Sequence, residues 1–113
     1  MNNYFIQAED DIDLLDMLKG KTMIGMDSEW KPCLKPFTVE RIAIFQLSSD
    51  TDTFIIDLVA LRNSAALDAK LTDIFTDGRT LSIGFSFSSD MSMFDKSVPQ
   101  MSFYKHFVRF LDI

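Results

Sequence analysis

The sequence has a single cysteine, Cys33, and a single histidine, His106. One cysteine cannot form an internal disulfide or a zinc cluster of several thiolates. No stretch approaches the roughly 20 apolar residues that a membrane-spanning helix needs, and the opening MNNYFIQAEDD lacks the basic and then apolar layout of a secretory signal peptide. We therefore expect an intracellular protein of the nucleus or the cytoplasm, with no membrane partner.

Basic residues are in the minority. The sequence has 11 lysines and arginines against 17 aspartates and glutamates, which gives a net charge of -6. A chain of that charge repels nucleic acid as a whole, so any nucleic-acid site has to be local. No repeat and no linker rich in proline, glycine or serine divides the sequence. With 113 residues, 47% of them hydrophobic, residues 1–113 suit one small globular unit.

Short apolar runs bounded by turn residues predict a sheet. The strands that we expect lie at about residues 22–30, 41–47, 53–58 and 80–85, with a fifth in the tail. The turn SSDTD joins the second and third runs as a hairpin.

Helical spacing of apolar residues predicts helices over residues 9–19 and 64–76. Gly20 ends the first, and a short third helix begins at Ser88 or Ser89. If helix 64–76 is a crossover, the strand at 80–85 runs parallel to the first strand. The predicted fold class is α/β, a mixed sheet flanked by helices.

The stretch MIGMDSEW places Asp27 and Glu29 two residues apart on a predicted strand. Residues at that spacing point to the same face, about 6.6 Å apart, so the two carboxylates form one acidic patch. A hard divalent cation with oxygen ligands would stabilise such a pair. Taken alone, the tripeptide fits a solvated pair on an edge strand as well or better.

A third acid, Asp90, follows the strand at 80–85 and opens the short helix. It fits a helix N-terminal acid that interacts with the helix dipole, but the ends of parallel strands are also where sites are usually built. Three carboxylates brought together could hold two divalent metals, the arrangement used in phosphodiester hydrolysis. We therefore expect Asp27, Glu29 and Asp90 to converge on one opening at the edge of the sheet.

The segments IGMDSEW, RIAIFQLSSDTDTFIIDL and LSIGFSFSSDMSMF resemble, in this order, the 3'-5' exonuclease domain of the DEDD superfamily, in its ribonuclease D and Werner-type branch. The resemblance implies a ribonuclease H-like fold. It also implies that Asp27, Glu29 and Asp90 are catalytic metal ligands for two Mg²⁺ or Mn²⁺ ions. The implied reaction is hydrolysis of the terminal phosphodiester at the single-stranded 3' end of RNA or DNA.

The family's third motif, a Tyr or His four residues before an Asp, is not found in the sequence. Tyr104 is followed at that spacing by Val108, and His106 by Phe110. The chain therefore resembles the N-terminal portion of such a domain, truncated at its C-terminus, and a longer parent protein with a further domain is expected. The alternative is a non-catalytic module, derived from this fold, that binds nucleic acid or a protein partner.

Three cations follow the first acidic motif: Lys31, Lys35 and Arg41. They could contact substrate phosphates or belong to a solvated loop. Asp112, near the end of the chain, resembles a structural aspartate of the family rather than the missing ligand.

Overall fold

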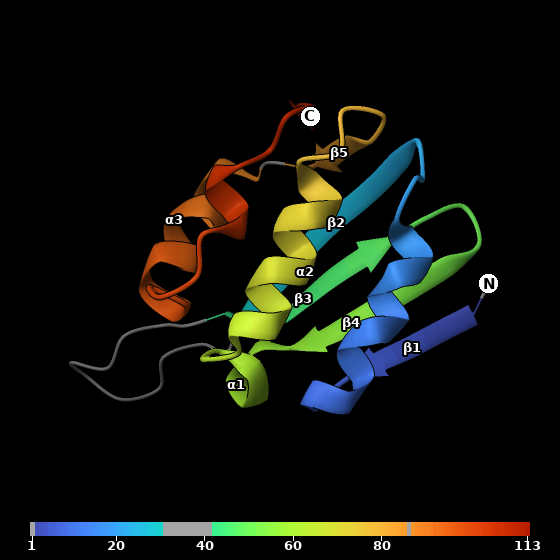
Figure 1. The fold of residues 1–113 in the computed structure, drawn as a ribbon. Helices are drawn as coiled ribbons and strands as arrows, with labels where there is room; N and C mark the ends of the chain where they lie inside the picture. The colour runs from blue at the N-terminus through green and yellow to red at the C-terminus, as the bar shows by residue number, and fades with distance from the viewer. Residues whose placement is uncertain (1, 31–41, 86) are drawn as a thin grey trace.

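The computed structural model describes residues 2–30, 42–85 and 87–113. Its centre is one six-stranded sheet with the order β1-β4-β3-β2-β5-β6 (Figure 1). The strands are β1 (Asn2–Ile6), β2 (Met23–Trp30), β3 (Ile42–Ser48), β4 (Asp52–Asp57), β5 (Leu81–Gly84) and β6 (Phe110–Asp112). β3 pairs antiparallel with both β2 and β4, and the other three pairings are parallel. The mixed sheet, the β3–β4 hairpin and the parallel β2–β5 pair confirm the predictions.

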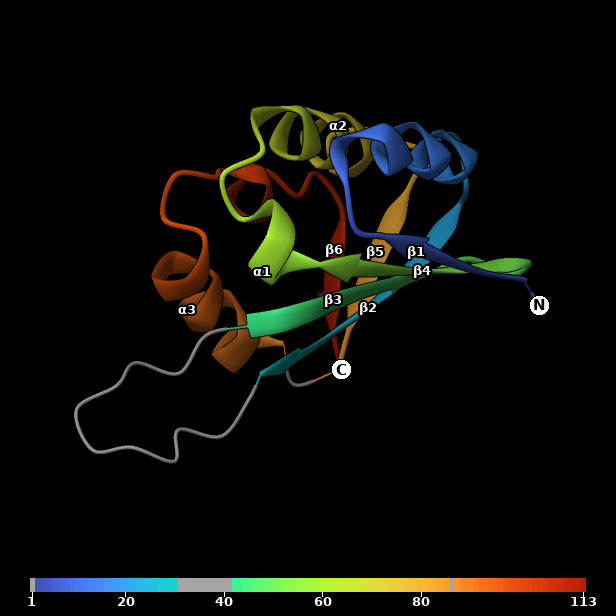
Figure 2. The same cartoon turned by 90° about the horizontal axis from the view of Figure 1, so that it is seen from below.

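The helices gather on one face of the sheet (Figure 2). They are the 3₁₀ helix η1 (Glu9–Leu18), α1 (Leu58–Leu61), α2 (Ala65–Phe75), α3 (Ser88–Ser97) and the 3₁₀ turn η2 (Phe103–Lys105). η1, α1 and α2 lie over the sheet, and α3 lies at the end of the sheet where β3 begins. Among the described residues, no helix lies across the opposite face, which we call the open face.

Strand register assigns side chains to the two faces. Asp27 pairs with Gln46, Gln46 with Ile55, and Ile55 with Phe5, so these four side chains share the open face. Ser28 pairs with Phe45, and both are buried on the helical face. The alternation predicted for the first strand is therefore present, with the two acids on one side and the intervening serine on the other.

The core on the helical face is mainly aromatic. Phe45 of β3 contacts Phe94 of α3 edge to face, with ring centroids 5.1 Å apart, and stacks on Phe103 at 5.7 Å. Phe75 of α2 packs edge-on against the same ring, with a centroid distance of 6.5 Å. Phe45 thus joins β3, α2, α3 and η2, and this packing fixes where α3 sits relative to the sheet.

Helix α2 is the predicted crossover, because it leads into β5, which runs parallel to β2. The Ser64 Oγ accepts a hydrogen bond from the Leu67 amide at 3.1 Å, which satisfies one of the free N–H groups at the start of the helix. Gly20, with a φ of 78°, ends η1 as expected because glycine adopts this conformation without a steric penalty.

Two parts of the fold differ from the expectation. The helix at residues 9–19 forms as a 3₁₀ helix that ends at Leu18. The strand β1 was not predicted, because its sequence NNYFI buries only Ile6 completely and therefore shows no clear alternation. The predicted cations Lys31, Lys35 and Arg41 lie outside the described residues.

Candidate nuclease site

Asp27 and Glu29 are exposed on the open face of β2. Their neighbours across the β2–β3 pairing are Gln46 and Ile44. The Asp27 Oδ1 accepts a hydrogen bond of 2.9 Å from the amide of Ser28, so this carboxylate folds back along its own strand. Among the described residues, no lysine or arginine forms an ion pair with either acid. The result is a pair of accessible carboxylates whose charge the described part of the chain does not neutralise.

Asp90 lies in the first turn of α3 and is buried, with 7% of its surface exposed. Its Oδ2 accepts a hydrogen bond of 2.5 Å from the Ser28 Oγ on the helical face of β2. This contact brings the second acidic motif to the strand that carries the first one. Ser28, which sequence reasoning left without a role, is the residue that joins them.

Two contacts place the start of α3 at this position. Phe87 packs so closely on Gly84 that a Cβ built at Gly84 would lie 2.5 Å from the Phe87 Cβ. The Phe87 amide also donates a hydrogen bond of 2.8 Å to the Asp112 Oδ1. Asp112 therefore makes a structural contact between β6 and α3, in agreement with its reading as a structural aspartate.

The structure brings the three predicted site residues to adjacent positions but not to one cluster. Asp27 and Glu29 face the open side of β2, whereas Asp90 contacts Ser28 on the helical side. In the described ranges, no three Asp, Glu, His or Cys side chains are grouped so that they could hold a metal ion. The convergence expected from the sequence is not seen, and the ligand roles of Asp27, Glu29 and Asp90 stay a prediction.

The chemistry of the donor set nevertheless fits a hard divalent cation. Carboxylate oxygens are the ligands that Mg²⁺ and Mn²⁺ prefer. Asp27 and Glu29 offer two carboxylates on one face of β2, where the strand pairs with β3. Within the described part of the chain, the Glu29 carboxylate makes no ion pair and is exposed, so it is available to a cation.

Tyr104 and His106 are the residue types that a third motif would use, but they have other surroundings here. Tyr104 is buried against Phe94, and its hydroxyl donates a hydrogen bond of 2.7 Å to the Asp95 Oδ1. Burial, and then the hydrogen bond to Asp95, raise the pKa of the Tyr104 hydroxyl well above its ordinary value. His106 is exposed. Tyr104 therefore has a packing role in this structure.

Residues 4–109 match the family model described as 3'-5' exonuclease. The chain belongs to this family. It is 32% identical over 91 residues to a protein named exonuclease mut-7 homolog from Aedes aegypti. That match covers 79% of this chain and 12% of the relative, so the chain spans only about an eighth of that protein.

Solved structures show the same fold. The Nibbler EXO domain of Aedes aegypti superimposes with a TM-score of 0.77 and 26% identity, over 88% of this chain and 46% of that one. The catalytic core of RRP6 from Trypanosoma brucei gives a TM-score of 0.76 and 20% identity, over 97% of this chain and 28% of that one. The ribonuclease H-like exonuclease fold expected from the sequence is confirmed. The described residues contain no helix long and apolar enough to cross a membrane.

Proposed function

We propose that this chain carries the first two acidic motifs of a metal-dependent 3'-5' exonuclease. The observation that supports this proposal is the arrangement around Ser28. Asp27 and Glu29 lie exposed on either side of it along β2, and its hydroxyl holds the carboxylate of Asp90. All three acids of the resemblance are thus next to one serine, although Asp90 lies 61 positions after Glu29 in the sequence.

In this proposal Asp27 and Glu29 hold the metal on the open face, and Asp90 is the third carboxylate of the site. Two divalent ions, Mg²⁺ or Mn²⁺, would polarise the phosphate, activate a water molecule and stabilise the leaving oxygen. They would also offset four of the six net negative charges. This local compensation would let an acidic chain accept a phosphodiester. Ser28 acts by orienting Asp90 and is a positioning residue.

The proposed substrate is the 3' end of a single-stranded RNA or DNA. An end can enter an exposed acidic patch on a sheet face that no described helix covers, without the strand having to thread a channel. Because the relatives are longer than this chain, the remainder of the catalytic machinery is proposed to belong to a longer parent protein.

Calorimetric titration with Mn²⁺ tests the metal site directly. We expect saturable binding to the unmodified chain, and its loss in Asp27→Asn and in Glu29→Gln. Asp73→Asn is the matched control, because Asp73 is exposed on α2, which lies on the helical face of the sheet and not on the open face. Equal Mn²⁺ binding by Asp27→Asn and Asp73→Asn would overturn the assignment of the metal to β2.

A second candidate is a non-catalytic module that binds nucleic acid or a protein partner. It is favoured by the burial of Asp90 against Ser28, on the other face from Asp27. The absence of a Tyr or His four residues before an Asp in this sequence also favours it. An oligonucleotide that binds equally well with Mn²⁺ and with EDTA, and that is never shortened, would select this candidate over the nuclease.

A further inference from the structure

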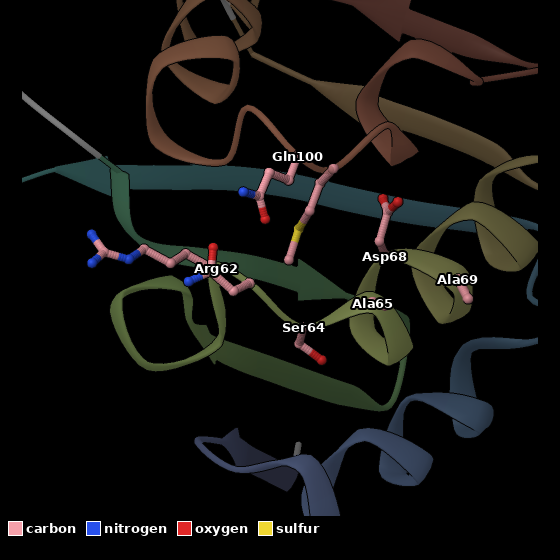
Figure 3. Close-up of a pocket in the computed structure, with 8 residues that line it drawn as sticks. Arg62, Ser64, Ala65, Asp68, Ala69 and Gln100 are labelled. Carbon is pink, nitrogen blue, oxygen red and sulfur yellow. The ribbon is translucent and has the colours of Figure 1, made fainter.

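Two adjoining cavities of about 200 Å³ each lie between the α1–α2 corner and the end of α3. Both are lined by Arg62, Asn63 and Gln100, and Lys96 lines the second. We call these four residues and the space between them the Arg62–Lys96 pocket. Figure 3 shows Arg62 at the corner between α1 and α2 and Gln100 on the segment that follows α3, both among the residues that line the first cavity.

Among the described residues, no carboxylate forms an ion pair with either cation of this pocket. Elsewhere in the described chain, most lysines and arginines lie within ion-pair distance of an aspartate: Lys19, Lys21, Lys70, Arg79 and Lys105. Within the same described ranges, Arg62 and Lys96 form no ion pair. In a chain with a net charge of -6, two unneutralised cations at one cavity create a local positive potential.

Asp68, the acid among the described residues that line the first cavity, is already engaged by other groups. Its Oδ1 accepts hydrogen bonds from the amides of Ser102 and Phe103, at 2.9 and 2.8 Å. Figure 3 shows this carboxylate directed toward the segment that follows α3. Asp68 therefore joins the segment that follows α3 to α2. It forms no ion pair with Arg62.

What remains in the pocket is a set of hydrogen-bond donors. Arg62 offers a guanidinium, Lys96 an ammonium, and Asn63 and Gln100 their side-chain amides. A guanidinium beside an ammonium and amide N–H groups is the combination that recognises a phosphate, through charge-assisted hydrogen bonds. A carboxylate ligand would use fewer of these donors than a phosphate with its several acceptor oxygens.

The length of α3 sets the distance between the pocket and Asp90. Asp90 is in the first turn of α3 and Lys96 in its last turn. Six residues of helix at about 1.5 Å each separate them by about 9 Å along the axis. A strand whose end lies near Asp90 could thus reach the pocket with a phosphate further from that end.

We propose that the Arg62–Lys96 pocket binds a backbone phosphate of the nucleic-acid strand whose 3' end lies at the proposed site, near Asp90. This proposal rests on the proposed function for the position of the end. Phosphate contacts position a strand and carry no sequence information. The pocket would therefore hold the strand in place, whatever its bases.

Fluorescence anisotropy with a labelled short oligothymidylate, in EDTA and over a series of salt concentrations, measures this contact without cleavage. We expect the double variant Arg62→Ala/Lys96→Ala to bind at least about tenfold more weakly, and the slope of log K against log salt to fall by about 0.7, the contribution of one single-strand phosphate. Arg109→Ala is the matched control, because Arg109 is an exposed cation outside the pocket that also forms no ion pair within the described residues. Equal loss of affinity in the double variant and in Arg109→Ala would overturn the proposal, as would no binding by the unmodified chain.

A second arm separates a strand phosphate from free phosphate. Amide resonances of residues 62–65 and 96–100 are followed by NMR while inorganic phosphate or the oligonucleotide is added. We expect both probes to shift them, with the oligonucleotide acting at lower concentration. Shifts with inorganic phosphate alone would identify a free-phosphate site and would overturn the strand subsite.

The outcome is distinguishable from failure of the nuclease proposal. Oligonucleotide binding is measured without metal, whereas the nuclease proposal depends on Mn²⁺ binding by Asp27 and Glu29. Oligonucleotide affinity that depends on Arg62 and Lys96, together with no Mn²⁺ binding, would support the pocket and reject the metal site.

Discussion

The hydroxyl of Ser28 donates a hydrogen bond to the carboxylate of Asp90 across 62 residues of sequence, with an Oγ to Oδ2 distance of 2.5 Å. Both side chains are buried, with 8% and 7% of their surfaces exposed. The bond joins the central strand of the sheet to the first turn of α3. It is the direct contact between the two acidic motifs on which the functional proposal depends.

Replacing Ser28 with alanine is expected to destabilise the chain by about 1 to 3 kcal/mol, because a buried carboxylate loses a donor. Urea denaturation of the purified chain measures the change. Ser92→Ala is the control, since Ser92 is exposed on α3 and its loss should cost less than about 0.5 kcal/mol. Equal free energies of unfolding for the two variants would mean that the hydrogen bond from Ser28 to Asp90 does not contribute to stability.

Trimming of a labelled single strand in Mn²⁺ is expected to be slow or absent for this chain. The sequence has no Tyr or His four residues before an Asp, and a positioned general acid or base is worth roughly 10² to 10⁴ in rate. Gel analysis against the Aedes Nibbler EXO domain as a comparison enzyme measures the difference. Robust trimming that disappears in Asp27→Ala would contradict this expectation and show that these residues suffice.

Gly84→Ala is expected to destabilise the chain by about 1 to 3 kcal/mol through overpacking. The new methyl group would lie 2.5 Å from the Phe87 Cβ and 2.7 Å from its Cγ, so α3 would have to shift. Thermal denaturation compares it with Gly78→Ala, where a Cβ would meet nothing within 4 Å. We expect the Gly78 variant to be neutral or slightly stabilised, and a similar loss in both would argue against the close contact.

The stability of the chain is expected to fall at high pH through Tyr104. The folded state raises the pKa of this hydroxyl, so its stabilising effect is complete below the ordinary value of 10.0 and is lost as the pH rises toward the folded pKa. Melting temperatures on either side of pH 10.0 measure the loss. The Tyr104→Phe variant should be less stable than the unmodified chain at neutral pH, but its melting temperature should fall less between neutral and high pH. Parallel pH curves would contradict this assignment.

The open face is expected to make the chain associate as its concentration rises. Large apolar side chains are exposed at Phe5, Met23 and Leu111, with 56%, 56% and 46% of their surfaces accessible, and such patches favour association. Light scattering over a dilution series measures it. Phe5→Ser should weaken association, whereas Val59→Ser, at a residue of α1 that is also exposed, should not. A monomer at all concentrations would contradict the expectation.

The sequence predicted the parts of the site that depend on local pattern. The two-residue period of MIGMDSEW placed Asp27 and Glu29 on one face, and Ser88 correctly began the helix that carries Asp90. The contact between Ser28 and Asp90 could not be predicted in the same way. It depends on Phe87 packing against Gly84 and on Asp112 holding the Phe87 amide. The Asp112 and Ser28 contacts join residues 25 and 62 positions apart, and contacts of that range leave no local periodicity.

The acids of the proposed site are held in the fold in two different ways. β2 pairs with β5 over Met23–Met26 and with β3 from Gly25 onward, so amides in the doubly paired stretch should be among the slowest to exchange with deuterium. Asp27 and Glu29 follow directly on this stretch and pair with β3. Asp90 instead belongs to a helix held by side-chain packing and a few hydrogen bonds. The placement of Asp27 and Glu29 therefore depends on backbone pairing, whereas that of Asp90 depends on side-chain contacts, namely its hydrogen bond to Ser28 and the packing of Phe94 on Phe45.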